Sequence, residues 1–271
     1  MPVVTASEYS HQLELLKVDD VTLQYKTPLH LVTATYKVSF SVRERDRYVI
    51  LGPSGCGKST LLKAVGGFMA PVAGTISVRG QLVSAPGPDR MMVFQEFEQL
   101  MPWKTVLQNV MFPMSATGKY SRAEARERAT ATIERVKLGK FRDAYPHMLS
   151  GGMKMRVALG RAMALDPAML LMDEPFASLD ALTRREMQEE LLSLWDQSRF
   201  TVLFVTHSIE EAILVGSRIL VLSPHPGRVR AELDVGHFRF DSIESAEFGL
   251  AAKRIHGLLF GKSPVAVEEL I

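Results

Sequence analysis

Residues 52–60 read Gly-Pro-Ser-Gly-Cys-Gly-Lys-Ser-Thr, and no other stretch of the chain is as informative. It fits the pattern GxxxxGK[ST], in which glycines let the backbone turn its N–H groups inward around an anion. A strand-like run, residues 47–51, precedes it and is apolar from Tyr48 to Leu51, and a helical run, residues 60–65, follows it. A glycine-rich turn that merely joins a strand to a helix is the alternative. The flanking runs favour a phosphate-binding loop, and therefore a bound nucleoside triphosphate.

Individual residues of this loop have expected roles. Lys58 is predicted to reach the β- and γ-phosphates, and the Ser59 hydroxyl is predicted to ligate Mg²⁺. Cys56 is expected to be a small residue that fills the loop rather than a nucleophile, because no His or second Cys is close in sequence. The residues expected to contact the nucleotide are Gly52, Pro53, Ser54, Gly55, Cys56, Gly57, Lys58, Ser59 and Thr60.

The composition limits the remaining classes of protein. With 46% hydrophobic residues, a chain of 271 residues can bury a large core, which excludes a disordered protein. The 32 basic and 30 acidic residues leave a net charge of +2, so the overall charge gives no reason to expect a nucleic acid as partner. A single cysteine cannot form an internal disulfide, in agreement with a reducing compartment.

The hydropathy pattern predicts neither a signal peptide nor a transmembrane helix. No apolar run approaches the roughly 18 to 20 residues that span a bilayer. Residues 1–20 lack a basic segment followed by an apolar one. We therefore expect the chain to stay in the cytosol.

Strand patterns predict an α/β fold with a mainly parallel sheet, because strands alternate with helices along much of the chain. Alternating apolar and polar residues at 13–25 and 36–42 predict antiparallel strands, which would form an N-terminal β subdomain. Further strands are expected at residues 74–80, 90–94, 168–172, 201–205 and 219–222.

Helical patterns occupy the middle and the end of the chain. Residues 105–164 predict an inserted α-helical subdomain, with bounds at about 96–164. Other helices are expected at residues 179–197, 209–215 and 245–260, the last in a helical tail of about 231–271. All of these elements are expected to belong to one domain, residues 1–271.

Two adjacent carboxylates follow a buried strand. Residues 169–172 are apolar, and Asp173 and Glu174 come directly after them. Ligands gather at the carboxyl ends of parallel strands, so this pair is expected beside the metal. Asp173 is predicted to hold Mg²⁺, commonly through water, and Glu174 to polarise the attacking water. An acidic pair that only ends a strand and caps the next helix is the alternative.

One further segment carries a family resemblance. Residues 149–162 read Leu-Ser-Gly-Gly-Met-Lys-Met-Arg-Val-Ala-Leu-Gly-Arg-Ala, which resembles the LSGGQ signature and following helix of ABC transporter ATPases. The resemblance covers nearly the whole chain and implies a P-loop NTPase core of the RecA-like kind. Met153 stands in place of the usual Gln, a departure that leaves the serine hydroxyl and the glycine N–H groups unchanged.

The signature segment also implies a partner. Its first residues begin a helix and would form a second anion site, which lies too far along the fold to meet the phosphate loop of its own chain. The resemblance therefore implies a second copy of the chain, placed head to tail, with two ATP molecules between the copies. The residues that would contact this nucleotide are Ser150, Gly151 and Gly152.

The resemblance implies roles for several other residues. Gln95 fits the Q-loop, which contacts the metal and the attacking water, and His207 fits the switch histidine that reaches the γ-phosphate. Residues 178–180 fit the D-loop. Tyr25 falls where an aromatic residue stacks on adenine, and Tyr36 is the competing candidate. The implied catalytic residues are Glu174, His207, Gln95 and Lys58, and the implied metal ligands are Ser59, Gln95 and Asp173.

Two short segments resemble importers of the nitrate, sulfonate and taurine group. Residues 96–110 resemble their LLPW-x-TV-x-x-NV segment, and residues 224–229 their RPGR-type turn, with His225 in place of the usual Arg. The resemblance implies uptake of a small anion, with transmembrane permease subunits as direct partners and an extracytoplasmic solute-binding protein as an indirect one. The chain would then lie peripherally on the cytoplasmic face of the membrane. Trp103 would contact the permease or, alternatively, pack in the core.

A soluble ABC ATPase acting in DNA repair or translation is the alternative function. Such proteins usually carry two cassettes or long coiled-coil insertions, whereas this chain has one cassette and no sustained heptad pattern. We therefore expect an ATP-hydrolysing transport subunit, with ATP and Mg²⁺ as cofactors and no nucleic acid as partner.

Overall fold

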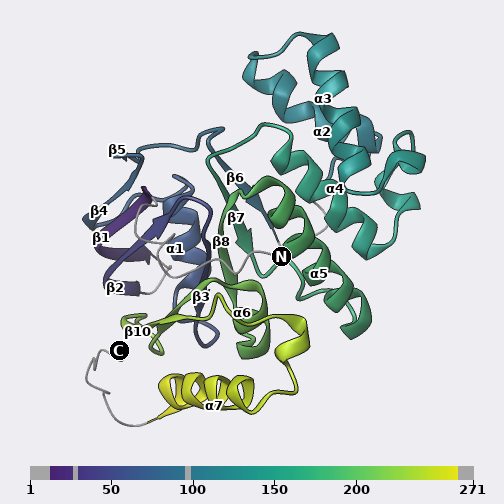
Figure 1. The fold of residues 1–271 in the computed structure, drawn as a ribbon. Coiled ribbons are helices and arrows are strands. Elements are labelled where there is room, and N and C mark those ends of the chain that lie inside the picture. Colours follow the sequence, from purple (N-terminus) through teal and green to yellow (C-terminus); the bar gives the residue numbers. More distant parts are fainter. Residues whose placement is uncertain (1–12, 27–29, 95–98, 262–271) are drawn as a thin grey trace. The chain divides into compact units, whose positions relative to one another are not determined.

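The computed structural model describes residues 13–26, 30–94 and 99–261. The chain divides into two compact units. The first unit is Met1–Ala85 together with His207–Ile271, and the second unit is Pro86–Thr206. Each unit has strands and helices of its own (Figure 1).

An antiparallel sheet forms the N-terminal part of the first unit. Val18 of its strand β1 pairs with Phe40 of β2 on one side and with Ile76 of β4 on the other. This sheet confirms the predicted N-terminal β subdomain. Strand β2 begins earlier than the pattern predicts, because its first residues pair with the end of β1, Tyr25 with Val32. The strands lie in the order β2-β1-β4-β5, with β1 at Glu14–Lys26, β2 at Leu31–Arg43, β4 at Ala73–Val78 and β5 at Gln81–Leu82 (Figure 1).

Three more strands of the first unit surround the start of the phosphate loop. Strand β3, Arg47–Leu51, is buried along its whole length and pairs in parallel with β9, Arg218–Leu222. Strand β10, Val229–Asp234, runs antiparallel to β9 and is an element that the patterns above do not predict. Helix α6, Ile209–Val215, packs on β3, and α7, Ala246–Phe260, packs on α6 and β9. The helix expected at the end of the chain is therefore confirmed.

Parallel strands also form the sheet of the second unit. Nearly all residues of β7 and β8 are buried, as expected for strands that are covered on both faces. In this part of the sheet Leu171 of β7 pairs with Met92 of β6 and with Leu203 of β8. These pairings confirm the predicted α/β class. The strands are β6 at Arg90–Val93, β7 at Met169–Asp173 and β8 at Thr201–Thr206.

Helices make up the rest of the second unit. Three of them, α2, α3 and α4, pack on one another, and each begins at a hydroxyl residue that accepts a hydrogen bond from a backbone N–H of its first turn. The helical pattern expected at 105–164 is confirmed. Within the described ranges, no helix has both the length and the apolar character needed to cross a membrane. The helices are α2 at Val106–Thr117, α3 at Arg122–Arg135, α4 at Gly151–Met163 and α5 at Ala181–Ser198 (Figure 1).

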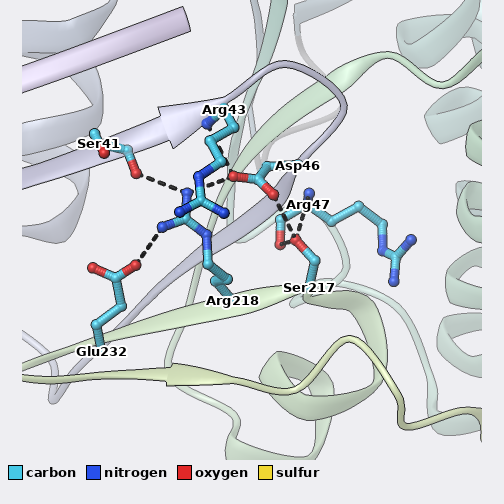
Figure 2. Close-up of polar contacts among 7 residues, drawn as sticks. All are labelled: Ser41, Arg43, Asp46, Arg47, Ser217, Arg218 and Glu232. Carbon is cyan, nitrogen blue, oxygen red and sulfur yellow. Dashed lines mark hydrogen bonds and ion pairs between the residues drawn. The ribbon is translucent and has the colours of Figure 1, made fainter. Parts of the chain in front are cut away.

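A buried ion-pair cluster joins the two groups of strands in the first unit (Figure 2). The guanidinium of Arg218 on β9 lies 2.5 Å from a carboxylate oxygen of Asp46 and 2.5 Å from one of Glu232. It also donates to the backbone oxygen of Ser41 at 2.9 Å and lies over the ring of Tyr48, 4.8 Å from the centroid. The Asp46 side chain is only 3% exposed, so its charge depends on Arg218 for compensation.

We expect Arg218→Met to lower the free energy of unfolding by about 3 to 5 kcal/mol, because Asp46 would then be a buried charge without its cationic partner. Glu232→Gln is the matched control: this carboxylate is 37% exposed, so its loss should cost less than about 1 kcal/mol. Urea unfolding at pH 7 measures both values. Similar losses of unfolding free energy in the two variants would show that the charge of Asp46 does not depend on Arg218.

Candidate functional site

The phosphate loop lies between β3 and α1, Lys58–Val65, in the first unit. Gly57 is the N-cap of α1 and has a φ of 95°, a left-handed conformation that favours glycine. A Cβ at Gly57 would lie 2.6 Å from the backbone oxygen of Ala34 on β2. Position 57 therefore requires glycine, both for the backbone conformation and for the close approach to Ala34. The predicted strand, loop and helix are all confirmed.

Lys58 is held against the loop that precedes it. Its side chain is buried, and the ammonium donates to the backbone oxygens of Gly52 at 2.8 Å and Pro53 at 3.1 Å. Ser54 and Gly55 at the outer edge of the loop are exposed. The loop thus combines a fixed cation with accessible backbone and the N-terminus of α1, where an anion is favoured. Ser59 and Thr60, both half-buried, stand in the first turn of that helix.

Cys56 is inside the loop and is fully buried. Burial raises the pKa of its thiol, an effect that outweighs the opposing charge of Lys58. At neutral pH the thiol is therefore protonated and shielded, which makes it a poor nucleophile. This environment agrees with the prediction that Cys56 fills space in the loop.

The acidic pair ends strand β7 in the second unit. Asp173 is the last residue of the strand, and both carboxylate residues are half-buried. Glu174 has a φ of 45°, in the left-handed region that residues with a side chain rarely adopt, and its N–H donates to Val205 on β8 at 3.0 Å. The backbone thus changes conformation between the two carboxylates.

The signature segment begins helix α4, also in the second unit. Ser150 is the N-cap, and its exposed hydroxyl accepts a hydrogen bond from Met153 N–H at 3.4 Å. Gly152 is buried against α5, since a Cβ there would lie 3.0 Å from Thr183. The helix N-terminus with the Ser150 hydroxyl at its start is an arrangement that can bind an anion.

The loop between β7 and α5 follows the acidic pair. Asp180 caps α5 and accepts from Thr183 N–H at 3.0 Å, a hydrogen bond that lowers the pKa of its carboxyl group. Arg184 donates to the backbone oxygens of Phe176 at 3.3 Å and Leu179 at 2.9 Å. Arg184 thereby fixes this loop, a role that the sequence patterns do not reveal because its partners are backbone atoms.

The remaining predicted residues are spread over the chain. Tyr25, near the end of β1, is 44% exposed, and Tyr36 on β2 is 37% exposed with the Arg228 guanidinium 4.5 Å from its ring centroid. His207 is exposed and directly follows β8. Gln95 lies outside the described residues. The phosphate loop, both tyrosines and His207 belong to the first unit, whereas the acidic pair and the signature segment belong to the second.

Comparisons with known proteins find relatives for most of the chain. Residues 35–177 match the model of a family described as ABC transporter. The taurine import ATP-binding protein TauB of Rhizobium johnstonii is 46% identical over 226 residues, which cover 83% of this chain and 86% of that protein. The bicarbonate transport ATP-binding protein CmpD of a Synechocystis species is 41% identical, covering 83% of this chain and 80% of that protein.

Two solved structures of ATP-binding cassettes are also similar to this chain. The dimeric structure of a bacterial ABC transporter cassette has a TM-score of 0.71 and 32% identity, covering 83% of this chain and 100% of that one. A dimeric ATP-binding cassette in a post-hydrolysis state, bound to ADP and Pi, has a TM-score of 0.69 and 30% identity over the same shares of the two chains.

The left-handed backbone of Glu174 leads to a prediction about stability. Glu174→Gly should unfold with a free energy about 1 kcal/mol higher than that of Glu174→Ala, because glycine adopts a positive φ without strain. Urea unfolding of the two variants measures the difference.

Glu127 in the exposed part of helix α3 provides the matched control. There the order should reverse, with Glu127→Ala more stable than Glu127→Gly by about 1 kcal/mol. An alanine variant that is the more stable one at both positions would show that Glu174 carries no backbone strain.

Proposed function

The chain belongs to the ABC transporter family, and from that membership we propose that it is the ATP-hydrolysing subunit of an importer for a small anion. The observation that carries the proposal is its similarity, at 46% and 41% identity, to the ATP-binding proteins of a taurine importer and a bicarbonate transporter. Taurine bears a sulfonate group and bicarbonate is an anion, so both solutes match the group implied by the segments around Trp103 and His225. The same relatives favour transport over the alternative role in DNA repair or translation.

In this proposal the phosphate loop binds the triphosphate of ATP. Backbone N–H groups of the phosphate loop and the N-terminus of α1 surround the phosphates, and the Lys58 ammonium moves from its backbone partners to the β- and γ-phosphates. Tyr25, with its exposed ring, stacks on the adenine. The site thus recognises the charge of the nucleotide through fixed dipoles and one cation.

The donor atoms of Ser59 and Asp173 fit Mg²⁺, because this ion prefers hard oxygen ligands and one or two carboxylates beside phosphate oxygens. Gln95 would add an amide oxygen. When bound, the ion would neutralise negative charge on the β- and γ-phosphates.

Glu174 acts as the base in the proposed reaction. Its carboxylate accepts a proton from the attacking water, while Asp173, one residue earlier on β7, would hold Mg²⁺. In a regular strand, Glu174 would point to the face opposite Asp173. The left-handed backbone at Glu174 departs from this alternation, which supports a separate direction and a separate role for its carboxylate. His207 would contact the γ-phosphate, and Gln95 would orient the water.

Two copies of the chain would share each nucleotide. The signature segment offers Ser150, Gly151 and Gly152 at the start of α4, a second anion site on a different unit from the phosphate loop. Both dimeric cassettes described above are at least 30% identical to this chain, which supports a head-to-tail dimer with ATP at its interface.

An exposed aromatic surface is the proposed contact with the permease. Trp103 is 72% exposed and Phe112 on α2 is 42% exposed. The loop that carries Trp103 is fixed by the buried Asn109 side chain, which accepts from Met101 N–H at 2.9 Å and donates to Lys104 O at 2.9 Å. A rigid aromatic side chain that stays exposed is typical of an interface anchor. The solute-binding protein would act through the permease, on the other side of the membrane.

Trp103→Ala tests this contact. We expect it to weaken association with the permease by about 2 kcal/mol and to reduce uptake of the solute, while ATP hydrolysis by the isolated subunit is unchanged. Uptake of taurine and of bicarbonate is measured with the assembled transporter in vesicles.

Leu250→Ala is the matched control, because Leu250 is an equally exposed apolar residue, at 67%, on α7 of the other unit. It should alter neither uptake nor hydrolysis. Normal uptake by Trp103→Ala would remove the aromatic surface from the proposed interface.

A further inference from the structure

The turn at residues 223–228, between β9 and β10, lies against strand β2. Gly227 N–H donates to the backbone oxygen of Ala34 at 2.9 Å, and Tyr36 N–H donates to the backbone oxygen of Gly227 at 2.9 Å. Thr35 and Gly227 thereby form a parallel bridge. The turn is thus attached to β2 by backbone hydrogen bonds on both sides of one glycine.

The same glycine touches the phosphate loop. A Cβ at Gly227 would lie 2.2 Å from the backbone oxygen of Cys56 and 3.4 Å from its carbonyl carbon. Gly227 is not in the left-handed region, so the contact alone excludes a side chain. Ala34, which accepts from Gly227, also limits the space beside Gly57. The phosphate loop is therefore in contact with both β2 and the turn.

The turn is internally stiff. The Ser223 hydroxyl accepts from Arg228 N–H at 3.0 Å and donates to Pro226 O at 3.1 Å. Ser223 N–H donates to Arg228 O at 2.8 Å, which closes the turn. The Arg228 guanidinium then lies on the ring of Tyr36. A turn with these contacts can act as a fixed support for what packs against it.

We propose that this turn positions the phosphate loop, with Gly227 as a positioning residue for nucleotide binding. In a trans peptide the C=O and the following N–H point in opposite directions. Contact of the Cys56 oxygen with Gly227 therefore directs the N–H of Gly57 away from the turn, and a displaced Cys56 oxygen would rotate that donor. The proposal rests on the phosphate-binding role of the loop given above.

Gly227→Ala is the test, with two readouts. The added methyl group should raise the Kd and KM for ATP about tenfold with kcat little changed, since displaced binding groups lose alignment with the phosphates. It should also expose Cys56, the one cysteine of the chain, to iodoacetamide. In the unaltered protein this thiol is buried and its pKa is raised, so labelling at pH 8 should be slow.

Gly216→Ala is the matched control. A Cβ at Gly216 would also collide with a backbone oxygen, that of Ala212, at 2.6 Å, but beside Val49 rather than the phosphate loop. It should lower stability without changing the Kd for ATP or the labelling rate. Arg228→Ala, which removes the ring contact and adds no atoms, should change both readouts in the same direction as Gly227→Ala but less.

The outcomes separate this inference from the proposed function. Wild-type ATP affinity and slow Cys56 labelling in Gly227→Ala would overturn the positioning role, as would equal changes in Gly216→Ala. Failure of the unaltered protein to bind ATP would instead overturn the proposed function. The labelling rates would in that case still decide whether Gly227 positions Cys56.

Discussion

The phosphate loop depends on close backbone contacts that leave no room for side chains. Gly57 approaches the oxygen of Ala34, and Gly227 approaches the oxygen of Cys56. These contacts hold the buried side of the loop at Cys56 and Gly57. Lys58 holds the start of the loop by donating to the backbone oxygens of Gly52 and Pro53. Since an anion site needs donors held in place before the ligand arrives, this packing is the physical basis of the proposed nucleotide site.

The proposed chemistry is divided between the two units of the chain. The first unit contributes binding groups for the phosphates, and the second contributes the carboxylates of Asp173 and Glu174 and the start of helix α4. In the second unit, a left-handed backbone at Glu174 sets the direction of its carboxylate, and the Ser150 hydroxyl caps the start of α4. The loop after the acidic pair is held by hydrogen bonds from the Arg184 side chain to backbone oxygens. Neither unit alone presents both the phosphate loop and the signature segment. In the proposed dimer, ATP would therefore join the first unit of one copy to the second unit of the other.

Local patterns were sufficient to predict much of the fold. The strand, loop and helix around Lys58, the strand before Asp173 and the helices within residues 105–164 all follow from short runs of residues, and the structure confirms them. Strand β10 has an alternating pattern, Val-Arg-Ala-Glu-Leu-Asp, but none of its residues is buried, so it lacks the apolar run that marks the other strands of its sheet. The early start of β2 could not be predicted, because it arises from pairing with β1.

The sequence predicts the residues of the candidate site but not the contacts that hold them in place. The roles of Lys58, Asp173 and Glu174 follow from motifs, whereas Gly227 contacts a loop that is distant in sequence, and Arg218 and Asp46 are 172 positions apart. Such contacts depend on the completed fold, so no local pattern reports them. Gln95 remains a prediction, because it lies outside the described residues.

In the proposed dimer, two copies of the chain share ATP between the phosphate loop of one and the signature segment of the other. Sedimentation of Glu174→Gln with ATP and Mg²⁺ tests it most directly, since loss of the base should leave bound ATP intact. We expect a dimer with ATP and a monomer with ADP or without nucleotide, and a monomer under all conditions when Lys58→Ala is added. A monomer with saturating bound ATP, or a dimer that forms equally well without nucleotide, would contradict it.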